Sequence, residues 1–133
     1  MASQDLVSEI TPAIALASAS IASSTTTNGN SVDMQGAESL AFVFFSGAYT
    51  DGTYTPQIEE SSDNSTWSAV ADADLIGTEA SAAITAANEV FDIGYVGNER
   101  YVRLAVVSTS VTTGATIGAT AVKGHLRVSD TPA

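Results

Sequence analysis

The chain has 133 residues and a mass of 13.5 kDa, which is the size of one domain. It contains no cysteine, so disulfide bonds, thiolate metal sites and cysteine nucleophiles are excluded. Fifteen acidic residues against four basic ones give a formal net charge of −11. Because binding to phosphates or anionic lipid needs a basic surface, we expect neither nucleic acid nor membrane as a partner.

The N-terminal part of the sequence favours extended chain. Residues 1–12 show no apolar period and end at Pro12, which predicts an N-terminal arm. The Ala-rich stretch that follows has no Lys or Arg before it, unlike a secretory signal, so we expect a chain made in the cytoplasm. Residues 13–24 and the Ser/Thr run at 23–27 favour strand, and a turn is predicted at 28–30.

Two strands are predicted in the middle of the chain. Residues 40–45 form a continuous apolar run, which is typical of a strand buried on both faces. Asp51 and Gly52 predict a hairpin turn that leads into a strand at 53–59. Pro56 cannot donate a backbone hydrogen bond, so this second strand is expected at a sheet edge or at a bulge.

The following segments alternate between turns and short strands. A turn at 62–65 precedes a strand at 66–70, and residues 72–77 predict a loop or a short strand. Residues 78–89 contain five alanines but one large apolar residue, so a helix there would bury little and we expect irregular chain. Strands at 90–96 and 101–108 flank a turn at 97–99, which predicts a second hairpin.

The last predicted strand, at residues 116–128, alternates between apolar or small residues and basic ones. The face expected to point inward holds Val122, Gly124, Leu126 and Val128, and the face expected to point outward holds Lys123, His125 and Arg127.

Seven to nine short strands separated by Gly, Asn, Asp and Ser turns predict an all-β fold, an antiparallel β-sandwich that is jelly-roll-like. We place the β-sandwich domain at residues 13–128, the extended N-terminal arm at 1–12 and a C-terminal tail at 129–133.

The sequence offers little for catalysis, and we expect no enzyme and no cofactor. His125 is the only histidine, and no nucleophile-elbow motif accompanies it. The spacing of Gly114 and Gly118 lacks the Lys-Ser/Thr of a phosphate-binding loop. Asp72 and Asp74 would share one face of a strand, as an acid pair or as half of a calcium site; their spacing leaves cation binding open.

Aromatic residues lie mainly inside apolar strand runs, so core packing is expected for six or more of the nine. Trp67 follows a turn and has two interpretations, core packing or surface binding.

Basic residues gather in the last third of the chain and form a candidate partner-contact patch. Its members are Arg100, Arg103, Lys123, His125 and Arg127. They either pair with acidic neighbours of the same chain or present a positive surface to an acidic partner.

Three segments together resemble the small β-rich head proteins of tailed bacteriophages, the capsid decoration or cement proteins. They are VDMQGAESL at 32–40, QIEESSDNSTWSAV at 57–70 and IGYVGNERYVRL at 93–104. The resemblance spans residues 31–107 and is one of pattern and turn chemistry. It supplies no catalytic, cofactor-binding or metal-binding residue to carry over.

This resemblance implies a structural virion protein on the capsid surface. Such a protein binds the outside of the expanded shell, clamps neighbouring subunits of the major capsid protein, and forms a homo-oligomer, a dimer or a trimer, that gains from several weak contacts. The alternative is a carbohydrate- or receptor-binding β-sandwich of a phage tail or fibre, which would expose Trp67 or a group of tyrosines.

Overall fold

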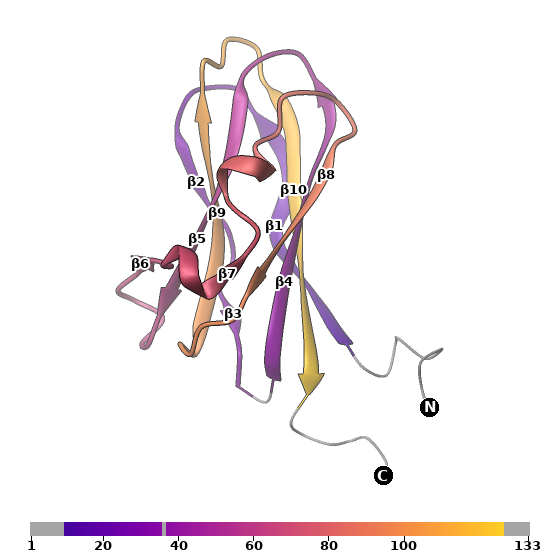
Figure 1. The fold of residues 1–133 in the computed structure, drawn as a ribbon. Helices are drawn as coiled ribbons and strands as arrows, with labels where there is room; N and C mark the ends of the chain where they lie inside the picture. Colours follow the sequence, from indigo (N-terminus) through magenta and orange to yellow (C-terminus); the bar gives the residue numbers. More distant parts are fainter. Residues whose placement is uncertain (1–9, 36, 127–133) are drawn as a thin grey trace.

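The computed structural model describes residues 10–35 and 37–126, excluding the side chains of Glu38, His125 and Leu126. These residues form ten strands and two single-turn 3₁₀ helices (Figure 1). The long strands are β1 (Ile10–Ile21), β4 (Ala37–Tyr49), β5 (Thr53–Ser61), β8 (Val90–Tyr95), β9 (Tyr101–Thr109) and β10 (Ala115–Leu126). The short elements are β2 (Thr26–Asn28), β3 (Val32–Asp33), β6 (Ser68–Ala69), η2 (Asp72–Asp74), β7 (Leu75–Ile76) and η3 (Ala80–Ala82).

The strands form two antiparallel sheets packed face to face. The first, sheet A, has the order β1-β10-β4-β8-β7. The second, sheet B, has the order β2-β9-β5-β6, and β3 also pairs with β9. The predicted all-β antiparallel sandwich is therefore confirmed. The described residues form ten strands where seven to nine were expected, and the number includes three strands of only two residues. Strands β1, β4 and β10 are longer than expected.

Two of the three predicted hairpins are wrong, because the chain changes sheet at their turns. The turn at Asp51 and Gly52 joins β4 of sheet A to β5 of sheet B, and the turn at 97–99 joins β8 of sheet A to β9 of sheet B. Only the predicted strand–turn–strand at 57–70 is a true hairpin, with Glu59 opposite Ala69. Turn residues predict that the chain reverses direction, and the chain also reverses where it crosses from one sheet to the other.

The core lies between the sheets and is supplied by alternate residues of each strand. Leu40, Phe42 and Phe44 of β4 are buried there, opposite residues such as Ile58 and Leu104 of sheet B. Each such side chain contributes about 1.5–3 kcal/mol by leaving water. The intervening residues of β4 are partly exposed on the outer side of sheet A. The expectation that residues 40–45 are buried on both faces is therefore wrong within one chain.

The predicted faces of the last strand are also reversed. In β10 the buried side chains are odd-numbered, among them Ile117, Ala119 and Ala121; Gly118 is covered by the ring of Phe45, and Val122 is partly exposed. By the two-residue period, Val122 lies on the outer side of sheet A and Lys123 on the inner side. Small alanines occupy the inner positions because Leu40 and Phe42 on the adjacent β4 fill the space.

The boundaries of the domain shift at the N-terminal side. Strand β1 begins at Ile10 and pairs Pro12 with Val122, so residues 10–12 of the expected arm belong to sheet A. Residues 1–9 of the arm and residues 127–133, which include Arg127, Val128 and the expected tail, lie outside the described residues.

Strand β5 explains how Pro56 is accommodated. One side of β5 pairs with β9 along its whole length, whereas the other side meets only β6 and single contacts. There the N–H of Ile58 donates to Oε2 of Glu79 at 2.6 Å, and Tyr54 and Ile84 exchange two backbone hydrogen bonds. Pro56 lies on this incompletely paired side, as the sequence predicts for an edge position.

Residues 78–89 contain η3 and are otherwise irregular, as expected, and residues 72–77 form a loop with a short strand. This loop holds η2 and β7, and Asp72 and Asp74 lie in the η2 turn rather than on one face of a strand. Asp72 is exposed. The described part of the chain contains no helix with the length and hydropathy needed to cross a membrane.

Candidate functional site

The predicted basic residues divide between two places in the fold. Arg100 and Lys123 meet at Asp33, at one end of the sandwich. Arg103 lies on the outer face of sheet B. The side chain of His125 and the whole of Arg127 lie outside the described residues. The structure therefore brings together only part of the predicted patch.

Arg100 is held by a fork of hydrogen bonds. Its Nε and one terminal nitrogen donate to the two carboxylate oxygens of Asp33, each at 3.0 Å, and the same terminal nitrogen donates to Gln35 at 2.7 Å. The guanidinium hydrogen bond and the backbone N–H of Gln35 lower the pKa of Asp33. With about half of each side chain exposed, this ion pair is a surface contact of small stabilising effect.

Lys123 connects the two sheets. Its Nζ donates to the backbone carbonyl of Asp33 at 3.1 Å, which links β10 of sheet A to β3 of sheet B. The sequence predicts this lysine on the outer face of its strand, which is wrong. At the open end of the sandwich an inward lysine reaches a carbonyl oxygen without crossing the apolar core.

Arg103 makes the more buried ion pair. Its Nε donates to Oε1 of Glu59 at 2.7 Å, and only 19% and 17% of the two side chains are exposed. The register places the two residues directly opposite each other on β9 and β5. The guanidinium also lies over Trp67, 4.4 Å from the ring centroid, which is a cation–π contact.

Trp67 is positioned by the turn that precedes it. The carboxylate of Asp63 accepts hydrogen bonds from the hydroxyl of Ser61 and from the N–H groups of Ser65 and Thr66, all at 2.9 Å. These bonds lower the pKa of Asp63. Asn64 adopts a left-handed φ of 61°, which Asn tolerates well. The indole is half-buried at the rim of sheet B.

A second cation–π contact involves Arg100, next to the start of β9. The Arg100 guanidinium is 5.0 Å from the ring centroid of Tyr101, and Tyr101 and Arg103 both point outward from β9. Trp67, Arg100, Tyr101 and Arg103 together are called the Arg–aromatic cluster below. The sequence singled out the two arginines by their rarity, but it missed Asp33 and Glu59 as their partners, because only the strand register brings these residues together.

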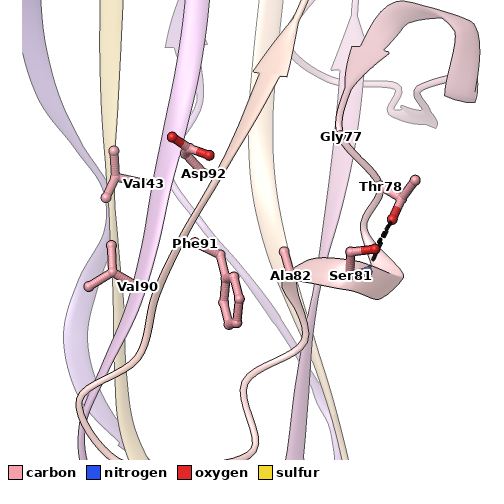
Figure 2. A pocket seen from close by; sticks show the side chains of 8 residues that line it. All are labelled: Val43, Gly77, Thr78, Ser81, Ala82, Val90, Phe91 and Asp92. Carbon is pink, nitrogen blue, oxygen red and sulfur yellow. Dashed lines mark hydrogen bonds between the residues drawn. The ribbon is translucent and has the colours of Figure 1, made fainter.

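Among the pockets on the described surface, two have lining residues that bear on the site. A pocket of about 430 Å³ lies next to Arg100, between residues 97–100 and a wall of Met34, Gln35 and Ala37. A pocket of about 270 Å³ lies where β7 ends and leaves the edge of β8 uncovered. Figure 2 shows Thr78 and Ser81 on one side of this pocket and Val43 and Val90 on the other. The Thr78 hydroxyl donates to Ser81 at 2.6 Å.

Acidic residues do not converge on a metal-binding arrangement in the described ranges. Among residues 10–35 and 37–126, no group of three or more His, Asp or Glu side chains is arranged to hold a metal ion.

Comparisons with known proteins are limited to structural similarity. No protein-family model matches the chain, and no curated protein matches it. The solved structure of the PBSX exported protein XepA has a TM-score of 0.58 and 18% sequence identity over 92% of this chain. The SPBc2 prophage-derived protein YomS has a TM-score of 0.48 and 17% identity, over 86% of this chain and 93% of YomS. This chain spans 41% of XepA, and the match shows that the two share the β-sandwich fold.

Proposed function

We propose that this chain is a structural phage protein that binds the outside of the expanded capsid as a decoration protein and clamps neighbouring major capsid protein subunits. The fold shared with XepA, a phage-derived protein, supports the phage origin. The resemblance of residues 31–107 to small phage head proteins supports the decoration role. In this proposal the chain has no enzymatic activity and no cofactor, is made in the host cytoplasm and resides on the virion surface.

The Arg–aromatic cluster is the observation that carries the proposal. Trp, Tyr and Arg are the residues most enriched among those that dominate binding energy at protein interfaces. Here Trp67 and Tyr101 are partly exposed and each stacks with a guanidinium. Because Arg103 is also held by Glu59, its side chain is ordered before any partner binds. Less conformational entropy is then lost on binding.

The Arg–aromatic cluster concentrates positive charge in an otherwise acidic chain. The net charge is −11, yet two of the four Lys and Arg residues lie in the cluster. A partner surface with acidic groups would be repelled by most of the chain and would be oriented toward the arginines. Weak single contacts are sufficient when an oligomer binds several shell subunits at once.

The copy number of the chain in purified particles tests the proposal. We expect a simple ratio to the major capsid protein, near one chain per subunit or one per three subunits, in particles of the phage that encodes it. A few copies per particle would place the chain at the tail or portal, and its absence from particles would overturn the proposal. Binding of the purified chain to expanded and unexpanded shells then locates the contact, with Trp67→Ala expected to weaken it and Thr26→Ala as the control.

A second candidate function is carbohydrate or receptor binding by a tail or fibre module. The half-buried Trp67 favours it, because indole rings stack on the apolar faces of sugars. Polar side chains of Glu59 and Arg103 lie beside the ring and could bind sugar hydroxyls. Titration with glycans separates the two functions: a change in the emission of Trp67 supports sugar binding, whereas a decoration protein shows no change.

A further inference from the structure

The exposed large hydrophobic residues among residues 10–35 and 37–126 gather on one surface, the outer side of sheet A. The four that are more than half exposed among the described residues are Ile14, Ile76, Val90 and Val96, at 62%, 64%, 64% and 52%. Ile14 pairs with Thr120 on β10, and Ile76 pairs with Gly94 on β8. Val96 directly follows β8 and has the same phase as Gly94 and Val90. We call this surface the apolar face.

The strand register extends the apolar face across the whole sheet. Thr120 pairs with Val43, and Val90 pairs with Phe45, so rows of outward residues run from β1 to β8. Apart from Asp92, which pairs with Val43 and ends the row of Ile14 and Thr120, the remaining members of these rows are small or apolar: Pro12, Ala41, Gly94, Gly118 and Val122. Figure 1 shows β10, β4 and β8 side by side in this layer.

Two glycines let neighbouring apolar side chains lie across the apolar face. A Cβ added at Gly118 would lie 2.8 Å from Cζ of Phe45, so the absence of a side chain lets this ring lie across the neighbouring strand. A Cβ added at Gly94 would lie 3.2 Å from Cβ of Ile76, which packs over the glycine in the same way. An apolar sheet surface of this kind suits packing against a second sheet, about 10 Å away.

Charge is nearly absent from this face. Among its described residues only Asp92 is charged, and Asp92 lies at the margin, on β8 where β7 no longer covers the strand. The outer face of sheet B differs, because the Arg103–Glu59 ion pair crosses it. In a chain of net charge −11, the apolar face is therefore a surface where two copies can meet with few like charges placed directly against each other.

The sequence of β4 points to burial of both its faces. Residues 40–45 are all apolar, a composition typical of strands covered on both sides. Within one chain only Leu40, Phe42 and Phe44 are buried, while Ala41, Val43 and Phe45 face outward. A partner over sheet A would cover these outward residues, and both faces of β4 would then be buried, as its apolar sequence predicts.

We propose that a second copy of this chain covers the apolar face, with the two sheets A packed face to face. The match is self-complementary, because each copy offers the other an apolar surface on which Asp92 is the one charged residue among those described. Neighbouring strands lie about 4.8 Å apart, and successive outward residues lie about 6.8 Å apart along a strand. For the five strands of sheet A these spacings give a face of about 600 Å², without the additional area of protruding side chains. Stable interfaces need about 800 Å² per partner, which this face approaches. The inference rests on sheet A alone and does not depend on the proposed capsid role.

Sedimentation velocity of the purified full chain over a hundredfold concentration range tests the proposal. We expect the wild type to have the mass of a dimer, and Val90→Lys and Ile76→Lys each to shift it to monomer by at least tenfold in dissociation constant. Both side chains are exposed in the monomer, so the variants are expected to fold, which circular dichroism and thermal melting check. Thr26→Lys, an exposed β-branched residue on a strand of sheet B, is the matched control and should leave the dimer intact.

Each result has a defined meaning. A wild type that stays monomeric throughout the range overturns the proposal, as does an oligomer whose mass Val90→Lys and Ile76→Lys leave unchanged. A monomeric wild type whose binding to shells is lost in Val90→Lys would assign the face to the capsid protein instead of a second copy. Failure of shell binding with an intact, Val90-dependent dimer would overturn the proposed function and leave this inference standing.

Discussion

The hydroxyl of Tyr95 donates a hydrogen bond to Oε1 of Glu60 at 2.7 Å, joining β8 of sheet A to β5 of sheet B. The same hydroxyl accepts a bond from the N–H of Glu99 at 3.1 Å, which fixes the crossing between the sheets. Burial and the nearby Glu60 carboxylate raise the pKa of Tyr95, so the hydroxyl keeps its proton and remains a donor. This end of the sandwich is thus closed by polar contacts between the sheets.

Tyr95→Phe tests how much this closure contributes. The ring stays buried, but Glu60 loses a donor and the Glu99 N–H loses its acceptor. We expect the free energy of unfolding to fall by roughly 1–2 kcal/mol, measured by urea denaturation. Tyr101→Phe is the control, because the Tyr101 hydroxyl has no hydrogen-bond partner among the described residues, and should change stability by less than about 0.5 kcal/mol. Equal losses in both variants would contradict the assignment.

The period-two pattern was sufficient to predict strands and the sandwich, but it could not assign the strands to sheets. The turns at Asp51 and at 97–99 look like hairpin turns because the local residues favour a reversal, whereas long-range pairing decides which sheet the next strand joins. The faces of β10 were reversed for a related reason. Val122 is larger than Ala121, yet the alanine is inside because β4 already fills the core there.

The candidate site was predictable only in its arginines. Arg100 and Arg103 stand out in an acidic sequence, but the partners that orient them are 67 and 44 residues away. Nothing local in the sequence marks Glu59 as a partner of Arg103, and the position of Trp67 after a turn fits both core packing and surface binding. Both become specific only through the register of β5 with β9 and the turn built on Asp63.

Acid should weaken the end of the sandwich opposite Tyr95. The carboxylate of Asp51 accepts the N–H groups of Thr112, Thr113 and Gly114 at 2.9–3.1 Å, which lowers its pKa below the ordinary value. A depressed pKa in the folded state contributes stability that is present above the unfolded pKa of about 3.9 and is lost as pH falls through the folded pKa. We expect Asp51→Asn to be less stable than wild type at pH 7, with the difference shrinking below about pH 4.

Urea denaturation of both proteins between pH 3 and pH 7 measures this difference. Asp72→Asn serves as the control, since Asp72 is exposed and its carboxylate accepts no hydrogen bond within the described part of the chain. A stability difference for Asp51→Asn that stays constant over this range would show that the three backbone contacts do not depend on the carboxylate charge.

Gly29 is required by packing rather than by turn geometry. Its N–H donates to the carbonyl of Leu104 at 2.9 Å, and the segment passes between β1 and β9. A Cβ at this position would press against the backbone carbonyl oxygens of Ala15 and Leu104. We expect Gly29→Ala to lower the free energy of unfolding by at least about 3 kcal/mol, because both carbonyl oxygens are held as acceptors of the Gly29 and Asn30 N–H groups and cannot move without breaking these bonds.

Gly47 supplies the matched control for that substitution. A Cβ at Gly47 meets only the side chain of Thr116, at 3.8 Å, which is an ordinary contact. Gly47→Ala should therefore change stability by less than about 1 kcal/mol, in the stabilising direction, by reducing the entropy of the unfolded chain. Thermal melting of the two variants compares them directly, and similar melting temperatures would rule out the close approach at Gly29.

Arg103→Ala should be visible in the emission of Trp67, the only tryptophan of the chain. Removing the guanidinium exposes the ring face and leaves Glu59 without its ion-pair partner. We expect emission to shift to longer wavelength and stability to fall by about 2 kcal/mol, less than for a fully buried pair because part of each side chain reaches solvent. Glu59→Gln separates the two effects, because it removes the ion pair but keeps the guanidinium over the ring. It should lose stability with little change in emission, and a shift as large as that of Arg103→Ala would mean that the ion pair, rather than the stack, shields Trp67.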